Sequence, residues 1–423
     1  MKMHLSHATS GIADSGSMAI TLSPSLLPAC VGFFFAFRLF SVVLAVRIFG
    51  QDASVGVVAS LGLNYLLFAI VAFHSIGEAR RTVVSMLQVP SSRWVLLFIC
   101  FTGASLMWSS TVSLPAAVAF WMAMAADTAM IVLLLRTGPV DAVVNAVMKG
   151  YVSGACAIAA IAWLLPAQSD LRLGDEELLG PNQIGYTCAI AFFFAQYLVR
   201  RKYGNWIVPA AFLVITLLRS LSKTTIIAFV AAQGYILLRD KSIKRKTKWL
   251  LAISALLIFV VFWSLLSNYF DVYVNAGNQS ETLTGRVEIW VYILNEAVQQ
   301  PWIGHGFHSV WKVIPPFGAD QFEARHAHNE LLQQFYAYGA VGVLMLVEIY
   351  GSLFRHLHRL HDKSMKTLFL GMLLFVAIRG LADTEVFDLS LPIWAIVMIG
   401  CLIEQARGDG AAFAWKAVSA HSK

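Results

Sequence analysis

Long apolar stretches alternate with short clusters of charged or turn-forming residues along most of the chain. The clearest of these breaks lie at 78–81, 136–139, 200–202 and 239–248. Many of the stretches between them approach the ~20 apolar residues that a helix needs to cross about 30 Å of hydrocarbon. The pattern therefore predicts an all-α, polytopic integral membrane protein with about 12 transmembrane helices. The expected spans are 27–46, 54–75, 94–110, 114–135, 142–165, 184–199, 205–218, 224–238, 249–269, 331–354, 367–382 and 388–404.

The amino-acid composition excludes most other classes of protein. Of 423 residues, 58% are hydrophobic and 13% are charged, whereas a soluble protein carries about 45–50% apolar and about 25% charged residues. A soluble enzyme, a disordered chain and a disulfide scaffold are therefore excluded. The five cysteines lie far apart without a Cys-x-x-Cys pair, so we expect no thiolate metal site. The net charge of +7 is not read as a nucleic-acid signal, because no basic run is interleaved with aromatic residues.

Basic residues predict the orientation. With a cytoplasmic N-terminus, the inner segments hold 21 of the 31 Lys and Arg residues, as the positive-inside rule requires. We expect cytoplasmic tails at 1–26 and 405–423, an uncleaved first span, helices across 27–269 and 331–404, and a large outer loop at 270–330. That loop is too long for a passive connector. It contains an amphipathic helical pattern with Val287, Trp290, Val291, Leu294, Ala297 and Val298 on one face.

Several polar residues on the outer side are candidates for chemistry. Arg219 and Lys223 flank the turn that contains Ser222. Lys223 is either an exposed loop cation or a phosphate ligand near a helix N-terminus. Arg286 is either a surface residue paired with a nearby Glu, such as Glu288, or a planar fork that suits a diphosphate.

His328 precedes the tenth expected span within the run His326-Ala327-His328-Asn329-Glu330. It is either a satisfied interfacial histidine or a neutral imidazole that acts as a general base. Histidines at i and i+2 are poor helical metal ligands, and no carboxylate pattern completes a site, so we expect no metal.

Two further polar groups have a structural and a functional interpretation. Asn182 follows Pro181 at the start of the sixth expected span, where the pair is either a helix start or a site. Arg379, Asp383 and Glu385 either form a salt bridge or line an outward cavity.

Three motifs, in this order, closely resemble the O-antigen ligase and polymerase superfamily of bacterial membrane glycosyltransferases. They are TLTGRVEIW at 282–290, PWIGHGF at 301–307, and HAHNELL at 326–332 followed by Gly339 and Gly342. Pro181-Asn182, the turn from Ser220 to Thr224 and Glu385 look like further family positions. Lys223 is a departure from the family pattern, since many members carry Arg at this position. Lys keeps the positive charge but loses the bidentate geometry of Arg.

The resemblance implies a GT-C-like enzyme of the bacterial inner membrane with its site facing the periplasm. It would be metal-independent, without a cofactor, and inverting, with a polyprenyl (undecaprenyl) diphosphate-linked glycan as donor. His328 would be the base, with Arg286 and Lys223 stabilising the leaving group. Asn182, Arg219, Ser222, Glu288, Asn329, Arg379 and Glu385 would bind substrate. A glycan or the lipid A core would be the acceptor, membrane lipid would surround the chain, and a chain-length regulator would be a further partner.

Three functions stay open at this point. The Gly304-x-Gly306-Phe307-x-x-Val-Trp311 run looks more like exopolysaccharide polymerases of the succinoglycan type, which favours an exopolysaccharide or O-antigen polymerase. An O-antigen ligase that acts on lipid A core is the alternative. A transporter of lipid-linked glycan is the rival from another class, although it would favour internal repeats and ionisable groups near mid-membrane.

Overall fold

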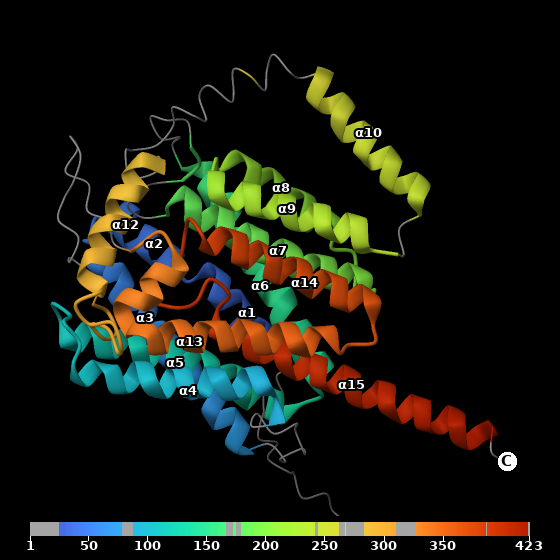
Figure 1. Ribbon diagram of the computed structural model, residues 1–423, viewed down its shortest axis with the longest axis horizontal. Helices are drawn as coiled ribbons and strands as arrows, with labels where there is room; N and C mark the ends of the chain where they lie inside the picture. Colours follow the sequence, from blue (N-terminus) through green and yellow to red (C-terminus); the bar gives the residue numbers. More distant parts are fainter. Residues whose placement is uncertain are drawn as a thin grey trace, which may run out of the picture.

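The computed structural model describes residues 25–77, 88–165, 172–174, 179–241, 244–261, 267, 283–309, 326–385 and 387–421. In these residues the regular secondary structure is helical, and most of the helices run along one common direction (Figure 1). The helices are α1 (Leu26–Phe37), α2 (Phe40–Arg47), α3 (Ala53–Gly77), α4 (Pro90–Ala104), the short 3-10 helix η2 (Ser105–Met107), α5 (Leu114–Thr137), α6 (Val140–Leu164), α7 (Pro181–Arg200), α8 (Ile207–Arg219), α9 (Lys223–Arg239), α10 (Arg245–Val261), α12 (Leu283–Ala297), α13 (Glu330–His358), α14 (Lys363–Gly380) and α15 (Ile393–His421).

The helices agree with a membrane protein, although fewer of them than the twelve expected spans are both long enough and apolar enough to cross a membrane. Within the described residues, four are long and apolar enough to cross a membrane: Ala53–Ile76, Leu114–Thr137, Val140–Leu164 and Glu330–His358. The pair α1 and α2, bent by 58°, would make a fifth. Each of the expected spans overlaps a helix, but the number of crossings and the side on which 270–330 lies stay predictions.

Small residues bring the first and sixth helical segments into close contact. Gly150 and Gly154 lie one turn apart on α6, and a Cβ atom on either would meet the backbone of Ala29 or Phe33 on α1. In a membrane this arrangement is a source of stability, because close backbones maximise van der Waals contact where lipid removes the hydrophobic driving force.

A buried carboxylate ties the bend between α1 and α2 to the helices around it. Asp127 on α5 forms an ion pair with Arg38 at 2.9 Å and accepts a hydrogen bond from Asn64 on α3 at 2.7 Å. An ionised group inside the bundle needs such partners, because an unpaired buried charge is costly.

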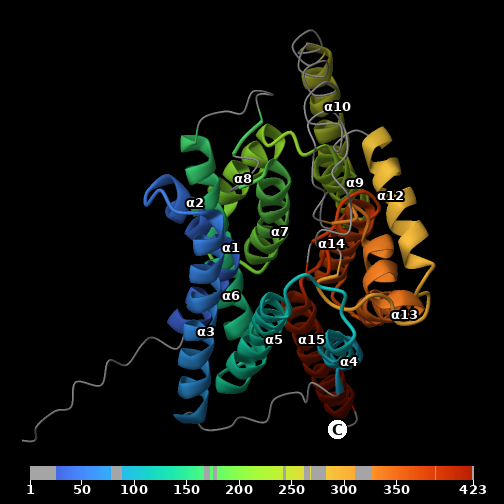
Figure 2. The ribbon, with the colours of Figure 1, turned by 90° about the vertical axis from the view of Figure 1, so that its left-hand side faces the viewer.

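One end of the bundle collects the segments that contain the sequence motifs. The chain passes back and forth, so the starts of α7, α9 and α13 and the ends of α8 and α14 lie at the same end (Figure 1). Helix α12 does not run with the others but crosses this end, and it lies at the edge of the bundle when viewed from there (Figure 2). This geometry brings residues far apart in sequence into one site.

Candidate functional site

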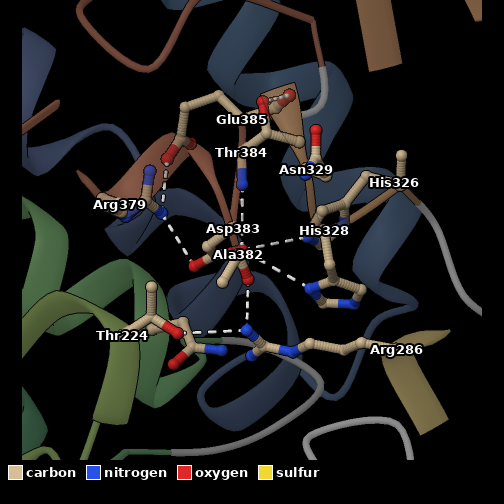
Figure 3. A network of polar contacts seen from close by, with 12 residues as sticks. Thr224, Arg286, His326, His328, Asn329, Arg379, Ala382, Asp383, Thr384 and Glu385 are labelled. Carbon is tan, nitrogen blue, oxygen red and sulfur yellow. Dashed lines mark hydrogen bonds and ion pairs between the residues drawn. The ribbon is translucent and has the colours of Figure 1, made fainter. Parts of the chain in front are cut away.

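The loop that follows α14 lies at the centre of a buried polar network (Figure 3). Arg379, in the last turn of α14, forms ion pairs with Asp383 and Glu385, both at 3.0 Å. The side chains of Arg379 and Asp383 are only 2% and 3% exposed. The guanidinium also lies over the ring of Tyr186, 4.2 Å from its centroid. Because buried charges are stable only with such partners, these contacts fix the path of residues 381–385.

Two histidines before α13 approach the same carboxylate oxygen. Nε2 of His326 lies 3.3 Å from Oδ1 of Asp383, and Nδ1 of His328 lies 3.5 Å from it. The centroids of the two rings are 4.0 Å apart. His328 has a backbone φ of 48°, in the left-handed region that non-glycine residues rarely adopt. Such strain persists where surrounding contacts hold it, and it is common at functional sites.

Asn329 fixes residues 326–329, which we name the histidine loop, against the loop after α14. Its Oδ1 accepts a hydrogen bond from the backbone N–H of Leu332 at 3.0 Å, which caps α13. Its Nδ2 donates to the carbonyl of Leu381 at 2.9 Å. Asn is a favoured N-cap residue, and here the one side chain both caps α13 and joins the two loops.

Arg286 reaches the same loop from α12. The side chain is 7% exposed. Its Nη1 donates to the hydroxyl of Thr224 at 3.0 Å and to the backbone carbonyl of Ala382. Four residues further along α12, Nε1 of Trp290 donates to the carbonyl of Ala327 at 2.9 Å. These contacts attach α12 to α9, to the histidine loop and to residues 381–385.

A second polar cluster lies at the start of α9. The hydroxyl of Ser222 donates to Oδ1 of Asn182 at 2.8 Å and lies 2.8 Å from the hydroxyl of Thr225. Nη2 of Arg172 donates to the same oxygen of Asn182 at 3.3 Å, and Arg172 is almost fully buried. The cluster joins the first turn of α7 to the first turn of α9, where helix N–H groups favour an anion.

The electrostatic environment keeps the His328 imidazole neutral and the Asp383 carboxylate ionised. Burial is the main cause that lowers the pKa of His328 to about 4, and His326 and Arg286 lower it further against the opposing effect of Asp383. Burial alone would raise the pKa of Asp383. The charge of Arg379 and the hydrogen bonds from both histidines outweigh burial, so that this pKa lies well below its usual range.

The two histidines and Asp383 also have the atom types of a metal site. Their nearest ligand atoms all lie within 4.8 Å of one another, and two His with one carboxylate is a known zinc ligand set. The sequence-based argument that no carboxylate completes a site is therefore wrong. It considered only neighbours in sequence, whereas Asp383 arrives from the end of α14. The ion pair between Asp383 and Arg379 argues against a resident metal ion, because the carboxylate already has a positively charged partner.

The predicted site residues fall into three groups. His328, Arg286, Asn329, Arg379 and Glu385 meet at the loop 381–385. Asn182 and Ser222 contact each other, and the half-buried Arg219 and Lys223 end α8 and begin α9 on either side of the same turn. Glu288 is exposed on α12. The interpretation of Arg286 as a surface residue is wrong, because the side chain is buried against Thr224 and Ala382.

Sequence reasoning left out His326, Thr224 and Arg172 as site residues. It grouped Asp383 with Arg379 and Glu385, as the ion pairs of Arg379 now bear out, but not with the two histidines. A signal existed for Asp383, which follows Arg379 by four residues, the spacing of an intrahelical ion pair. Nothing local marks Arg172, because its contact with Asn182 depends on how the loop before α7 folds.

Two comparisons with known proteins bear on the family to which the chain is similar. Residues 208–347 match the family described as O-Antigen ligase, a range that contains Lys223, Arg286 and the histidine loop. The chain is also 24% identical over 369 residues to "Exopolysaccharide production protein ExoQ" of Rhizobium meliloti (strain 1021), covering 80% of this chain and 82% of that protein. The resemblance of the chain to the O-antigen ligase and polymerase superfamily is thus confirmed.

Proposed function

We propose that the protein is an inverting, metal-independent glycosyltransferase of the bacterial inner membrane. It transfers a glycan from undecaprenyl diphosphate to an acceptor hydroxyl at the periplasmic face. One observation carries the proposal: Arg286 and His328, from different segments, are held beside one short stretch, Ala382–Asp383. A cation and a neutral imidazole side by side are what glycosyl transfer from a diphosphate requires.

The leaving group is a lipid diphosphate, which departs with negative charge. Arg286 and Lys223 stabilise this charge, and the N-terminus of α9 adds its N–H groups. Thr224 holds one nitrogen of Arg286 at 3.0 Å, so the guanidinium is oriented before the substrate arrives. Preorganised charge of this kind lowers the barrier because it needs no rearrangement during the reaction.

The acceptor hydroxyl has a pKa far above 7 and needs a base. His328 takes its proton as the hydroxyl attacks an anomeric carbon with oxocarbenium-like character. Asp383 orients the ring, and Arg379 acts through Asp383. Asn182, Arg219, Ser222, Glu288, Asn329 and Glu385 contact or position the donor and acceptor glycans.

Among the functions left open by the sequence, we favour a polymerase. The relative in Rhizobium meliloti is named an exopolysaccharide production protein, which supports repeated transfer onto a growing chain. The acceptor is then a second lipid-linked glycan, and a chain-length regulator is a further partner. A ligase would use lipid A core instead, with the same donor chemistry.

Glycan analysis of a deletion strain tests the proposal. Loss of polymer with accumulation of single repeat units on the lipid carrier is expected, and complementation with the His328→Ala variant should not restore polymer. Full-length chains that remain on polyprenyl diphosphate would replace the polymerase with a ligase. Lipid-linked glycan trapped on the cytoplasmic side would replace the enzyme with a transporter.

A further inference from the structure

Helix α12 meets the protein with only one of its faces. Ile289, Ile293 and Ala297 are buried together with Tyr336 and Ala327. The spacing of i, i+4 and i+8 places the three α12 residues on one side of the helix. This side also carries the buried Arg286, so it is the face that attaches α12 to the site.

A second face of α12 is apolar but exposed. Val287, Val291, Leu294 and Val298 are 45–55% exposed, and their spacing of i, i+4, i+7 and i+11 makes a continuous stripe. We name these four residues the apolar stripe. They are four of the six residues of the face that the sequence predicts; Trp290 and Ala297 of that face contact the protein, whereas these four are exposed. Large exposed apolar patches mark contact with a protein or a membrane.

The third face of α12 is polar. Glu288, Asn295 and Gln299 are exposed there. A helix that carries a polar face beside an exposed apolar stripe has the composition of one that lies at a water–lipid boundary. Its course across the end of the bundle, at the edge, agrees with this position (Figures 1 and 2).

Other exposed apolar residues follow α12 in the sequence or lie on α13, the helix against which α12 packs. Trp302, 74% exposed, and Ile303 follow directly after α12, and Leu331 is exposed at the start of α13. Along α13, a helix long and apolar enough to span a membrane, Leu344, Val347 and Phe354 are exposed as well. Exposed apolar residues of a spanning helix face lipid, and Trp is enriched where a membrane meets water.

We infer that α12 is an interfacial helix whose apolar stripe is covered by phospholipid acyl chains at the end of the bundle that holds the site. Its three faces contact protein, lipid and water. Because Arg286 lies in the first turn of the same helix, the lipid surface and the site share one rigid element. On the proposed function, membrane lipid thereby helps to hold the cation that stabilises the leaving group.

Photo-crosslinking tests the lipid contact without any assay of activity. A benzophenone amino acid is introduced at Val291 or Val298, and at the matched polar-face positions Asn295 or Gln299. Each protein is reconstituted into vesicles of phosphatidylethanolamine and phosphatidylglycerol and irradiated. Mass spectrometry is expected to find phospholipid adducts several-fold more abundant at the two stripe positions. Adducts to a second copy of the chain at those positions, or equal lipid adducts at all four, would overturn the inference.

A charge scan tests the link between the lipid contact and the site. Val291→Asp is expected to lower glycan transfer in the same vesicles several-fold, because the charge draws α12 away from lipid, while Asn295→Asp has no such effect. Equal activity of the two variants would overturn the link. The two proposals can fail separately. Absence of glycan transfer by the unaltered protein would contradict the proposed function. The crosslinking result alone would then decide whether α12 contacts lipid.

Discussion

Oδ1 of Asp383 lies 3.5 Å from Nδ1 of His328. On the proposed function, Nε2 is then the ring nitrogen that takes the proton of the acceptor. A carboxylate behind an imidazole fixes its tautomer and orientation. We therefore expect His328→Ala to lower the rate of glycan transfer by about 10²–10⁴, and Asp383→Asn to lower it substantially as well. Transfer between purified lipid-linked glycans in vesicles measures this rate. His326→Ala is the control, and a larger loss there than in His328→Ala would assign the base to His326.

Arg286 contributes geometry as well as charge. Its Nη1 donates to both Thr224 and Ala382, and the other nitrogens of the guanidinium are separate donors. Lys carries all its N–H groups on one nitrogen, so it cannot make both contacts and also present a second nitrogen to the substrate. Arg286→Lys is therefore expected to lower kcat by about 10²–10³, the usual cost of one oriented donor to a developing negative charge. Thr224→Val, which removes only the supporting hydroxyl, should cost less. If Arg286→Lys changes only KM for the donor, Arg286 binds the ground state and not the leaving group.

The acid side of the pH profile should report His328. Burial lowers its pKa from 6.5 to about 4, so the free protein holds a neutral imidazole through pH 5. We expect kcat/KM, which reports free enzyme, to stay level through pH 6.5 and to fall near pH 4. The profile of kcat should fall at a higher pH, because a bound diphosphate raises the pKa of a nearby imidazole. A fall of kcat/KM centred on pH 6.5, absent from a His328→Gln variant with residual activity, would contradict this.

The same shift predicts how the fold responds to acid. Because the folded pKa of His328 lies below the unfolded one, the neutral ring contributes stability that is present above pH 6.5 and is lost as the pH falls through about 4.

The sequence located the helices better than it located the site. The expected span at 331–354 begins within one residue of α13, because hydropathy is a local signal, and the cap supplied by Asn329 acts within that first turn. The stripe of α12 follows from periodicity, but periodicity cannot tell a protein-facing from a lipid-facing apolar surface, and the residues that pack are Ile289 and Ile293. Asp383 joins the histidines through the packing of α13 beside α14, which no local pattern records.

Metal dependence separates two uses of the histidine loop. If the site works without a metal, a chelator should leave transfer unchanged. Added Zn²⁺ should inhibit, because His326, His328 and Asp383 offer ligand atoms within 4.8 Å of one another. An ion bound at Nδ1 of His328, the nitrogen that faces Asp383, would leave the proton of the neutral ring on Nε2 and so remove the base. His326→Ala should relieve this inhibition while retaining transfer. Loss of activity on chelation, with recovery on adding one metal, would instead make the ion part of the mechanism.

The buried carboxylate of Glu330 should hold the start of α13 against the segment before α15. Its Oε1 accepts hydrogen bonds from the hydroxyl of Tyr350 at 2.8 Å and from the backbone N–H of Ser390 at 2.6 Å, so it joins the start of α13 to the segment before α15. Glu330→Ala leaves both donors without their acceptor. We expect it to lower the free energy of unfolding by about 2–3 kcal/mol. Tyr350→Phe removes one of these hydrogen bonds and the one that the hydroxyl accepts from the backbone N–H of Leu391 at 3.1 Å, and should cost about 1–2 kcal/mol.

The unfolding temperature in detergent, measured for both variants, checks the order of the two effects. Glu330→Gln keeps a side-chain oxygen that can accept one of the two hydrogen bonds, so it should fall between them. Unfolding temperatures that match the unaltered protein in all three variants would show that the segment before α15 is held by its other contacts, such as the hydrogen bond from the hydroxyl of Tyr186 to the carbonyl of Ser390.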